Sequence, residues 1–352
     1  MPPAPSTFGE RLQLARKMSG LSYQGLADKL NGLVTKQALH KYELGKMSPD
    51  SEKLIALANA LDVTVNFFYR DQPVKLEGIE FRKQVSLPIK EQDAIIGNIT
   101  DIMGRYLEVE RLVGAEKKFS NPIGKVEVTE PEQAEELADQ VRRKWKLGID
   151  AIPSVYETLE QQAIKVMECH GSRKFDGLNT HVDDHMVIVV NDDKDVVRKR
   201  FTAAHELGHA LLTIPDDVDH KIKERICHRF AGAFLFPREQ FMERVGPKRA
   251  RFMLDELVDW KESWGLSIKA IILRAHDLGI INDGVYKGML INYNRQGFAA
   301  DEPGEYKVNE RTVRFEQLVL SGLAQDILSL NQAADLMNMK MGEFRKKYSA
   351  AI

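Results

Sequence analysis

The sequence predicts a multidomain protein in which a small all-α domain is followed by an α+β domain and then by a helical C-terminal region. Short amphipathic segments with capping residues fill the first 70 positions. Two strand-like stretches, 164–168 and 186–190, then precede amphipathic helices at 196–212 and 221–236. With 352 residues, the chain is long enough for two or three domains, each with its own core.

The N-terminal segment reads as five short helices. Ser22, Thr35 and Thr64 stand where side-chain oxygens can cap the starts of helices. The predicted helices cover residues 11–18, 23–30, 36–43, 52–61 and the stretch from 64 to 69. Helices of this length form one small all-α domain.

Changes of pattern divide the chain into four segments. The helical pattern stops near Asp71-Gln72-Pro73, and 74–87 alternates like a strand or linker before a long helical stretch over 88–113. A segment at 327–337 looks like half a helix-turn-helix, and we expect it to form a packing or dimerising bundle. The predicted segments are an all-α domain over 8–72, a linker and helical region over 73–150, an α+β core over 151–240 and a helical region over 241–352.

The composition is that of an ordinary globular protein. Lys and Arg number 50 against 52 Asp and Glu, so nucleic-acid affinity must come from a local patch. The longest apolar runs are far shorter than the roughly 18 residues of a membrane helix. Two cysteines cannot make a disulfide framework, and the N-terminus lacks the pattern of a secretory signal. We therefore expect a cytoplasmic protein without a membrane partner.

The sharpest motif is His-Glu-x-x-His at residues 205–209, inside an amphipathic helix. Positions four apart lie on one helical face, so His205 and His209 can bind the same Zn²⁺ ion. Glu206 would stand beside the open coordination position and act as general base toward a water molecule there. The spacing predicts a catalytic zinc site, against the alternative of a chance match on a helix with satisfied histidines.

A catalytic zinc takes a third protein ligand, which we expect on the following helix. Glu224 is the first choice, because the turn at 213–217 can bring its helix back toward His209. His228 lies one turn further on and is either the alternative ligand or a residue that supports a ligand. Cys227 is more simply explained as a buried apolar residue.

These motifs resemble the ImmA/IrrE family of zinc metallopeptidases. The resemblance rests on RFTAAHELGH at 200–209 and ERICHRFAGAFLFP at 224–237, with Phe175-Asp176-Gly177-Leu178 upstream. It implies a zincin-like metallopeptidase domain with Glu224 as third ligand, over roughly residues 75–300. His228 departs from the family, whose members usually carry Asn or Asp there. The implied substrate is a repressor or another regulatory protein, as in stress-response switches.

The N-terminal domain resembles the Xre/Cro-type helix-turn-helix family over residues 8–70. The resemblance rests on 21–30, a short turn, and 35–45. Residues 1–70 carry a local charge of +3, the sign that DNA binding requires. In such a module the second helix enters the major groove. The residues then expected near bases and phosphates are Thr35, Lys36, Gln37, His40 and Lys41.

Together these features predict a DNA-binding transcriptional regulator that carries a zinc metallopeptidase, specifically a metalloendopeptidase acting on a regulatory protein such as a repressor. The alternative is a DNA-binding antitoxin or repressor whose zincin-like domain binds a partner, such as a cognate toxin, or senses a signal without proteolysis. The expected partners are a double-stranded operator and a protein substrate. We also expect a homodimer, because a single helix-turn-helix reads only a half-site. Both functions keep the metal site, and only peptide cleavage that depends on Glu206 distinguishes the first from the second.

Overall fold

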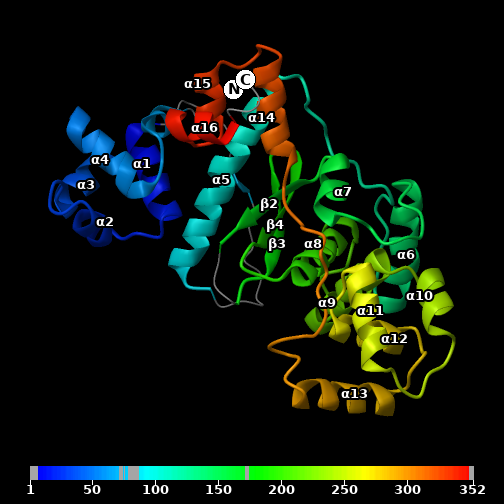
Figure 1. Ribbon diagram of the computed structural model, residues 1–352. Coiled ribbons are helices and arrows are strands. Elements are labelled where there is room, and N and C mark those ends of the chain that lie inside the picture. Colours follow the sequence, from blue (N-terminus) through cyan, green and yellow to red (C-terminus); the bar gives the residue numbers. More distant parts are fainter. Residues whose placement is uncertain (1–6, 71–73, 75, 78–86, 171–173, 349–352) are drawn as a thin grey trace. The chain divides into compact units, whose positions relative to one another are not determined.

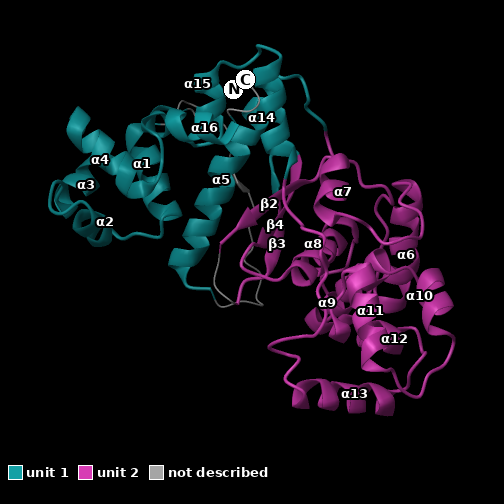
Figure 2. Ribbon diagram, viewed as in Figure 1, with its two compact units in different colours: residues 1–117, 181–184, 313–352 teal, residues 118–180, 185–312 magenta. Residues whose placement is uncertain are grey.

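The computed structural model describes residues 7–70, 74, 76–77, 87–170 and 174–348, which form two compact units (Figures 1 and 2). Unit 1 comprises residues 1–117, 181–184 and 313–352, and unit 2 comprises residues 118–180 and 185–312. Most of the predicted strand or linker at 74–87 lies outside the described residues. The two units do not coincide with the four predicted segments. Residues 87–117 and 313–348 belong to the same unit as the N-terminal helices, although the sequence placed them in two other segments.

Unit 1 begins with the predicted all-α domain. Each of its helices starts at a residue whose side chain accepts a backbone hydrogen bond, from Thr7 at the first to Thr64 at the last. Leu12, Leu39 and Phe67 are fully buried in its core. The elements are α1 (Phe8–Met18), α2 (Tyr23–Lys29), α3 (Lys36–Glu43), α4 (Ser51–Leu61) and the 3₁₀ helix η1 (Val65–Tyr69).

The rest of unit 1 is built around a long helix, α5 (Ile89–Leu112). Val109 of α5 shares a core with Val319 and Phe344 from the C-terminal helices. Those helices are α14 (Arg314–Ala324), α15 (Leu330–Leu336) and α16 (Met341–Tyr348). The segment at 327–337 therefore packs into a helical bundle, one of the two roles that its sequence suggested. The short strand β1 (Leu76–Glu77) pairs antiparallel with residues 181 and 182 of the same unit.

Ion pairs, one of them buried, connect the N-terminal helices to this bundle. Asp101 on α5 accepts hydrogen bonds from Arg11 of α1 at 3.1 Å and from Arg105 at 2.9 Å. Arg70 contacts Asp335 of α15 at 2.8 Å. The helix-turn-helix domain is thus fastened within unit 1 to helices from two distant parts of the sequence.

Unit 2 has the expected α+β architecture. The predicted strands appear as β2 (Lys165–Cys169) and β4 (His185–Asn191), and the predicted helix pair as α8 (Val196–Leu211) and α9 (His220–Leu235). The other helices are α6 (Pro131–Lys144), α7 (Val155–Gln161), α10 (Arg238–Val245), α11 (Leu254–Trp264), α12 (Ile268–Asp277) and α13 (Asp283–Arg295). The multidomain fold class is confirmed. Among the described residues, no helix is long and apolar enough to cross a membrane.

The sheet contains a strand that the sequence pattern did not predict, β3 (Gly177–Val182). β4 lies between β3 and β2, with β2 parallel to it. Because β4 has a neighbour on both sides, residues 186–191 offer no edge with which a substrate strand could pair.

Gly177 allows β3 to lie against α8. A Cβ atom at this position would come within 2.6 Å of the Thr202 side chain and 2.7 Å of the Val189 carbonyl oxygen. Both distances are too short for any side chain, so a glycine is required here. The close approach places the next residues of β3 beside the His-Glu-x-x-His motif.

A buried ion pair holds the N-terminal half of α8 in place. The Arg200 guanidinium contacts the Glu310 carboxylate, and both side chains have an exposed fraction of 0%. Glu310 also accepts hydrogen bonds from Ser154 Oγ and from the amides of Val155 and Tyr156, at the start of α7. One carboxylate therefore connects α7 and α8.

Candidate metal centre and DNA-binding surface

The candidate metal centre lies where α8 and α9 pack closely together. α8 buries Ala204 and Leu207, which turns the face that carries His205 and His209 toward α9. Gly208 permits the contact, since a Cβ atom there would lie 3.2 Å from the Phe230 ring and 3.4 Å from the Cα atom of Cys227. The helix pairing that the turn at 213–217 suggested brings Glu224 next to both histidines.

The donor atoms of these three residues face one common point. His205 Nε2 and His209 Nε2 are 3.1 Å apart. Glu224 Oε2 is 3.3 Å from His205 Nε2, and Glu224 Oε1 is 3.4 Å from His209 Nε2. Zinc bonds of 2.0–2.1 Å in a tetrahedron separate neighbouring ligand atoms by about 3.3 Å. The residues present therefore fit a zinc ion with three protein ligands, and they form the metal-binding cluster found among the described residues.

The surroundings of His209 favour its charged form. Burial opposes the charged form of His209, but hydrogen bonds to Cys227 and Glu224 outweigh it and raise the pKa of His209 to about 10. A metal ion would displace this proton, because imidazole binds metals in its neutral form. The Glu224 carboxylate is thus one of the groups that favour the charged form of His209, beside which it would bind a metal ion.

The motif glutamate has a hydrogen-bond partner that the sequence did not reveal. Asn179 Nδ2 on β3 donates to Glu206 Oε2 at 2.7 Å. One carboxylate oxygen of Glu206 is held by this bond, which leaves Oε1 for a water molecule. Asn179 directly follows Phe175-Asp176-Gly177-Leu178, the upstream stretch that carries part of the family resemblance. Its position next to that stretch is the feature of the sequence that could have indicated a place near the motif.

His228 contacts the centre without belonging to the metal-binding cluster. Its Nδ1 lies 2.7 Å from the backbone carbonyl oxygen of Glu224, to which it can donate, and its ring centroid is 4.5 Å from that of His205. Burial and the neighbouring His205 lower the pKa of His228 to about 4. The geometry supports a role in orienting the Glu224 backbone and the His205 ring. Cys227 is fully buried.

The different positions of Glu224 and His228 lead to a prediction. Glu224→Ala should raise the zinc dissociation constant by more than about 100-fold, because it removes a donor atom, whereas His228→Ala should cost at most about 10- to 100-fold. Competition with a chromophoric chelator measures both constants. Glu239→Ala, at an exposed carboxylate of α10, is the control. A larger loss for His228→Ala than for Glu224→Ala would exchange their assignments.

The predicted DNA-contacting residues are all accessible. Thr35 caps α3 by accepting a hydrogen bond from the Ala38 amide, and the face of α3 away from buried Leu39 is open to solvent. The exposed residues are Thr35, Lys36, Gln37, His40 and Lys41. The arrangement leaves this helix free to enter a groove.

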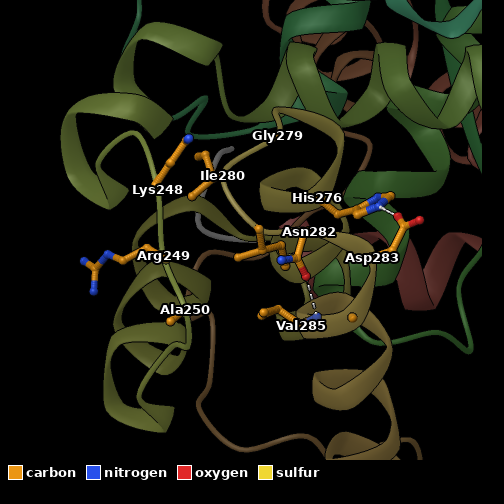
Figure 3. A pocket seen from close by; sticks show the side chains of 11 residues that line it. Lys248, Arg249, Ala250, His276, Gly279, Ile280, Asn282, Asp283 and Val285 are labelled. Atoms are coloured by element: carbon orange, nitrogen blue, oxygen red, sulfur yellow. Dashed lines mark hydrogen bonds and ion pairs between the residues drawn. The ribbon is translucent and has the colours of Figure 1, made fainter.

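Unit 2 contains two large cavities. A cleft of about 880 Å³ is lined by Phe201 of α8 and His228 of α9, so it adjoins the metal centre. Another cavity of about 880 Å³ lies between residues 248–250 and the region that joins α12 to α13 (Figure 3). His276 in that second cavity binds Asp283 at 2.7 Å, and none of its lining residues comes from α8 or α9. The first cleft is therefore the one that concerns the metal centre.

Fold and site together define a class, a helix-turn-helix protein joined to an α+β domain with a His-Glu-x-x-His motif and a candidate metal site. The family model for a helix-turn-helix, HTH_3, matches residues 12–68, and that for the IrrE N-terminal-like domain, Peptidase_M78, matches residues 159–276. The chain belongs to the HTH-type transcriptional regulators and carries an IrrE-like Peptidase_M78 domain.

Similar proteins exist for both parts. The uncharacterized HTH-type transcriptional regulator YqaE of Bacillus subtilis is 35% identical over 104 residues, which cover 29% of this chain and 88% of YqaE. The prophage-derived regulator YonR of the same organism is 43% identical over 63 residues, 18% of this chain and 56% of YonR. The radiation response metalloprotease IrrE of Deinococcus radiodurans is 35% identical over 79 residues, 18% of this chain and 24% of IrrE. The chain thus spans about a quarter of IrrE.

Proposed function

We propose that this regulator is a zinc metalloendopeptidase that binds an operator through α3 and hydrolyses a peptide bond in a regulatory protein such as a repressor. The observation that carries the proposal is the set of three donor-atom separations, 3.1, 3.3 and 3.4 Å, among His205, His209 and Glu224. The similarity to a relative named a metalloprotease supports it. A cytoplasmic location agrees with an operator as partner.

The proposed mechanism assigns a separate task to each residue. Two imidazoles and one carboxylate would hold the zinc ion, which when bound polarises the scissile carbonyl and acidifies a water molecule. Glu206 accepts the proton of the attacking water at Oε1 and later delivers it to the leaving amine. Asn179, bound to Oε2, keeps the carboxylate turned toward that water. A general base of this kind contributes typically about 10²- to 10⁴-fold to the rate.

The substrate would be held as an extended strand. Asn179 of β3 donates a hydrogen bond to Glu206, so the peptide would lie beside this part of β3. A peptide aligned here would present its backbone to the metal centre.

The test is a cleavage assay with the full chain. Zinc-loaded protein is incubated with a library of peptides derived from bacterial repressors, and new N-termini are identified by mass spectrometry. We expect defined cuts that disappear after removal of zinc by a chelator and return on addition of zinc. Cuts that persist without metal would point to a contaminating protease.

A second function has some support. YqaE and YonR, which match this chain, are described only as transcriptional regulators. In this alternative the metal centre is kept and the zincin-like domain binds a partner, such as a cognate toxin, or senses a signal. Stable binding of the partner without new N-termini would favour it.

DNA binding leads to a further prediction. Lys36→Ala or Lys41→Ala should weaken binding to all sequences and reduce the slope of log K against log salt by about one. Gln37→Ala should instead lower discrimination between operators, by about 1–3 kcal/mol at the base pair it contacts. The measurement is a titration of the full chain with duplexes selected from a random-sequence library, at several salt concentrations.

The control for these variants is Lys248→Ala, an exposed lysine of unit 2. It should leave both the affinity and the salt slope unchanged. We also expect the selected sites to contain two half-sites one helical turn apart, as a homodimer requires. Unchanged DNA affinity in all three α3 variants would reject this helix as the reading helix.

A further inference from the structure

The three C-terminal helices of unit 1 repeat the lengths of its first three helices. α14 and α1 each have 11 residues, α15 and α2 each have seven, and α16 and α3 each have eight. The connection between α15 and α16 covers 337–340, against 30–35 between α2 and α3. A turn of about three to four residues between two helices is typical of a helix-turn-helix. The end of the described chain therefore has the same order of elements as the N-terminal module.

A sequence pattern accompanies this repetition of elements. Ser-x-x-x-x-Ala-Asp-x-x-Asn occurs at 22–31 and again at 329–338. Ser22 and Ser329 each cap a helix by accepting a hydrogen bond from the amide three residues further on, at 3.0 and 3.2 Å. The alanine of each pattern is buried, and the asparagine of each has a φ of 50°, in the left-handed region. The cap, the small packing residue and the turn thus recur in the same order.

Helix α16 packs with one face and leaves the other open, as α3 does. Phe344 and Tyr348 of α16 are buried in the core that also contains Val109 of α5. Residues 342–343 and 345–347 are exposed. The second helix of this C-terminal pair is therefore accessible to a partner.

The open face of α16 is basic. Residues 340–348 contain four basic residues and one acidic residue, all of them exposed. Their local charge of +3 within nine residues equals that of the first 70 residues of the chain. Lys347 contacts Glu316 at 3.4 Å, whereas Arg345 and Lys346 have no side-chain partner among the residues that the structure describes. Two neighbouring cations are therefore available to an anionic partner.

The positions of these cations match phosphates better than bases. In a helix-turn-helix, the N-terminal residues of the recognition helix contact the base edges. The corresponding residues of α16, Met341 and Gly342, have no side-chain donor for a base. Arg345 and Lys346 lie in the second half of the helix, and contacts to the phosphate backbone carry no sequence information.

From these observations we propose that α14–α16 form a second helix-turn-helix, and that α16 binds the phosphate backbone of double-stranded DNA through Arg345 and Lys346. This contact adds affinity for any duplex, beyond the reading of an operator by α3. The inference rests on the proposed function in that the partner is DNA, but it does not require α3 to be the reading helix.

Salt-dependent DNA binding by the full chain tests the contact. The double variant Arg345→Ala/Lys346→Ala should reduce the slope of log K against log salt by about two, since each neutralised phosphate contributes about 0.9. At about 0.1 M salt, the affinity should fall about 10- to 100-fold. The fall should be equal for a selected operator and for a random duplex of the same length. Fluorescence anisotropy of labelled duplexes measures both affinities.

The matched control is Arg143→Ala/Lys144→Ala. It removes the same two charges from the exposed last turn of α6 in unit 2, and it should leave the affinity and the slope unchanged. Arg345→Lys/Lys346→Arg keeps both charges and should retain most of the affinity. Thermal unfolding followed by circular dichroism should be the same for all three variants, because the substituted side chains are exposed.

The outcomes separate this contact from the operator contact of α3. A slope and an affinity that match those of the α6 control overturn the second contact, even if the α3 variants weaken binding. An equal loss in the charge-conserving variant also overturns it. A loss confined to Arg345→Ala/Lys346→Ala, with unchanged binding in Lys36→Ala and Lys41→Ala, supports α16 and rejects α3. A wild type that binds no duplex at low salt rejects both contacts.

Discussion

Glu206→Gln should lower the rate of peptide cleavage by about 10²- to 10⁴-fold while the protein still binds one zinc ion per chain. The amide cannot accept a proton, and Glu206 lies outside the three-residue metal-binding cluster. His205→Ala or His209→Ala should instead lose both zinc and cleavage, because each removes an imidazole donor. Metal analysis of the purified variants and cleavage rates on the same peptide measure the two effects.

Operator binding is the matched control for these variants. Glu206 belongs to unit 2 and α3 to unit 1, so DNA affinity should be unchanged in Glu206→Gln. Loss of zinc in Glu206→Gln would show that this carboxylate is a ligand. Full cleavage in the variant would remove it from the mechanism.

Glu310→Ala should lower the free energy of unfolding of unit 2 by about 3–5 kcal/mol, because it leaves the buried Arg200 charge without its partner. It also removes the acceptor for two amides at the start of α7. Urea denaturation followed by tryptophan fluorescence isolates this unit, since Trp145, Trp260 and Trp264 all belong to it.

The control is Glu305→Ala, an exposed carboxylate close by in the sequence. It should change the free energy of unfolding by no more than about 0.5 kcal/mol. Equal stability of the two variants would mean that water or a neighbouring group compensates Arg200. Such a result would contradict the proposal that Glu310 stabilises the fold by connecting α7 and α8.

Local patterns predicted the helices and the core of the site. Capping residues such as Ser22 and Thr35 begin helices where expected, and the four-residue spacing brings His205 and His209 together. Helical periodicity also placed Glu224 near them. These features depend on residues close in sequence.

Features that depend on distant residues were not predicted. Gly177 and Asn179 are poor strand formers, so β3 could not be recognised, and with it the hydrogen bond to Glu206 and the internal place of β4 were missed. The grouping of α5 with the C-terminal helices depends on contacts between residues about 200 positions apart. Neither local propensity nor periodicity carries information of that range.

The composition of unit 1 has a consequence during protein synthesis. Helix α5 ends at Leu112 and its partner α14 begins at Arg314, after roughly 200 intervening residues. At about 5–20 residues per second, a ribosome needs roughly 10–40 s to translate that stretch. For this time the face of α5 that carries Val109 has no α14–α16 to cover it. The nascent chain therefore exposes this apolar surface until α14–α16 are translated. Because residues 313–352 of unit 1 follow unit 2 in the sequence, unit 1 can be completed only after unit 2 has been synthesised.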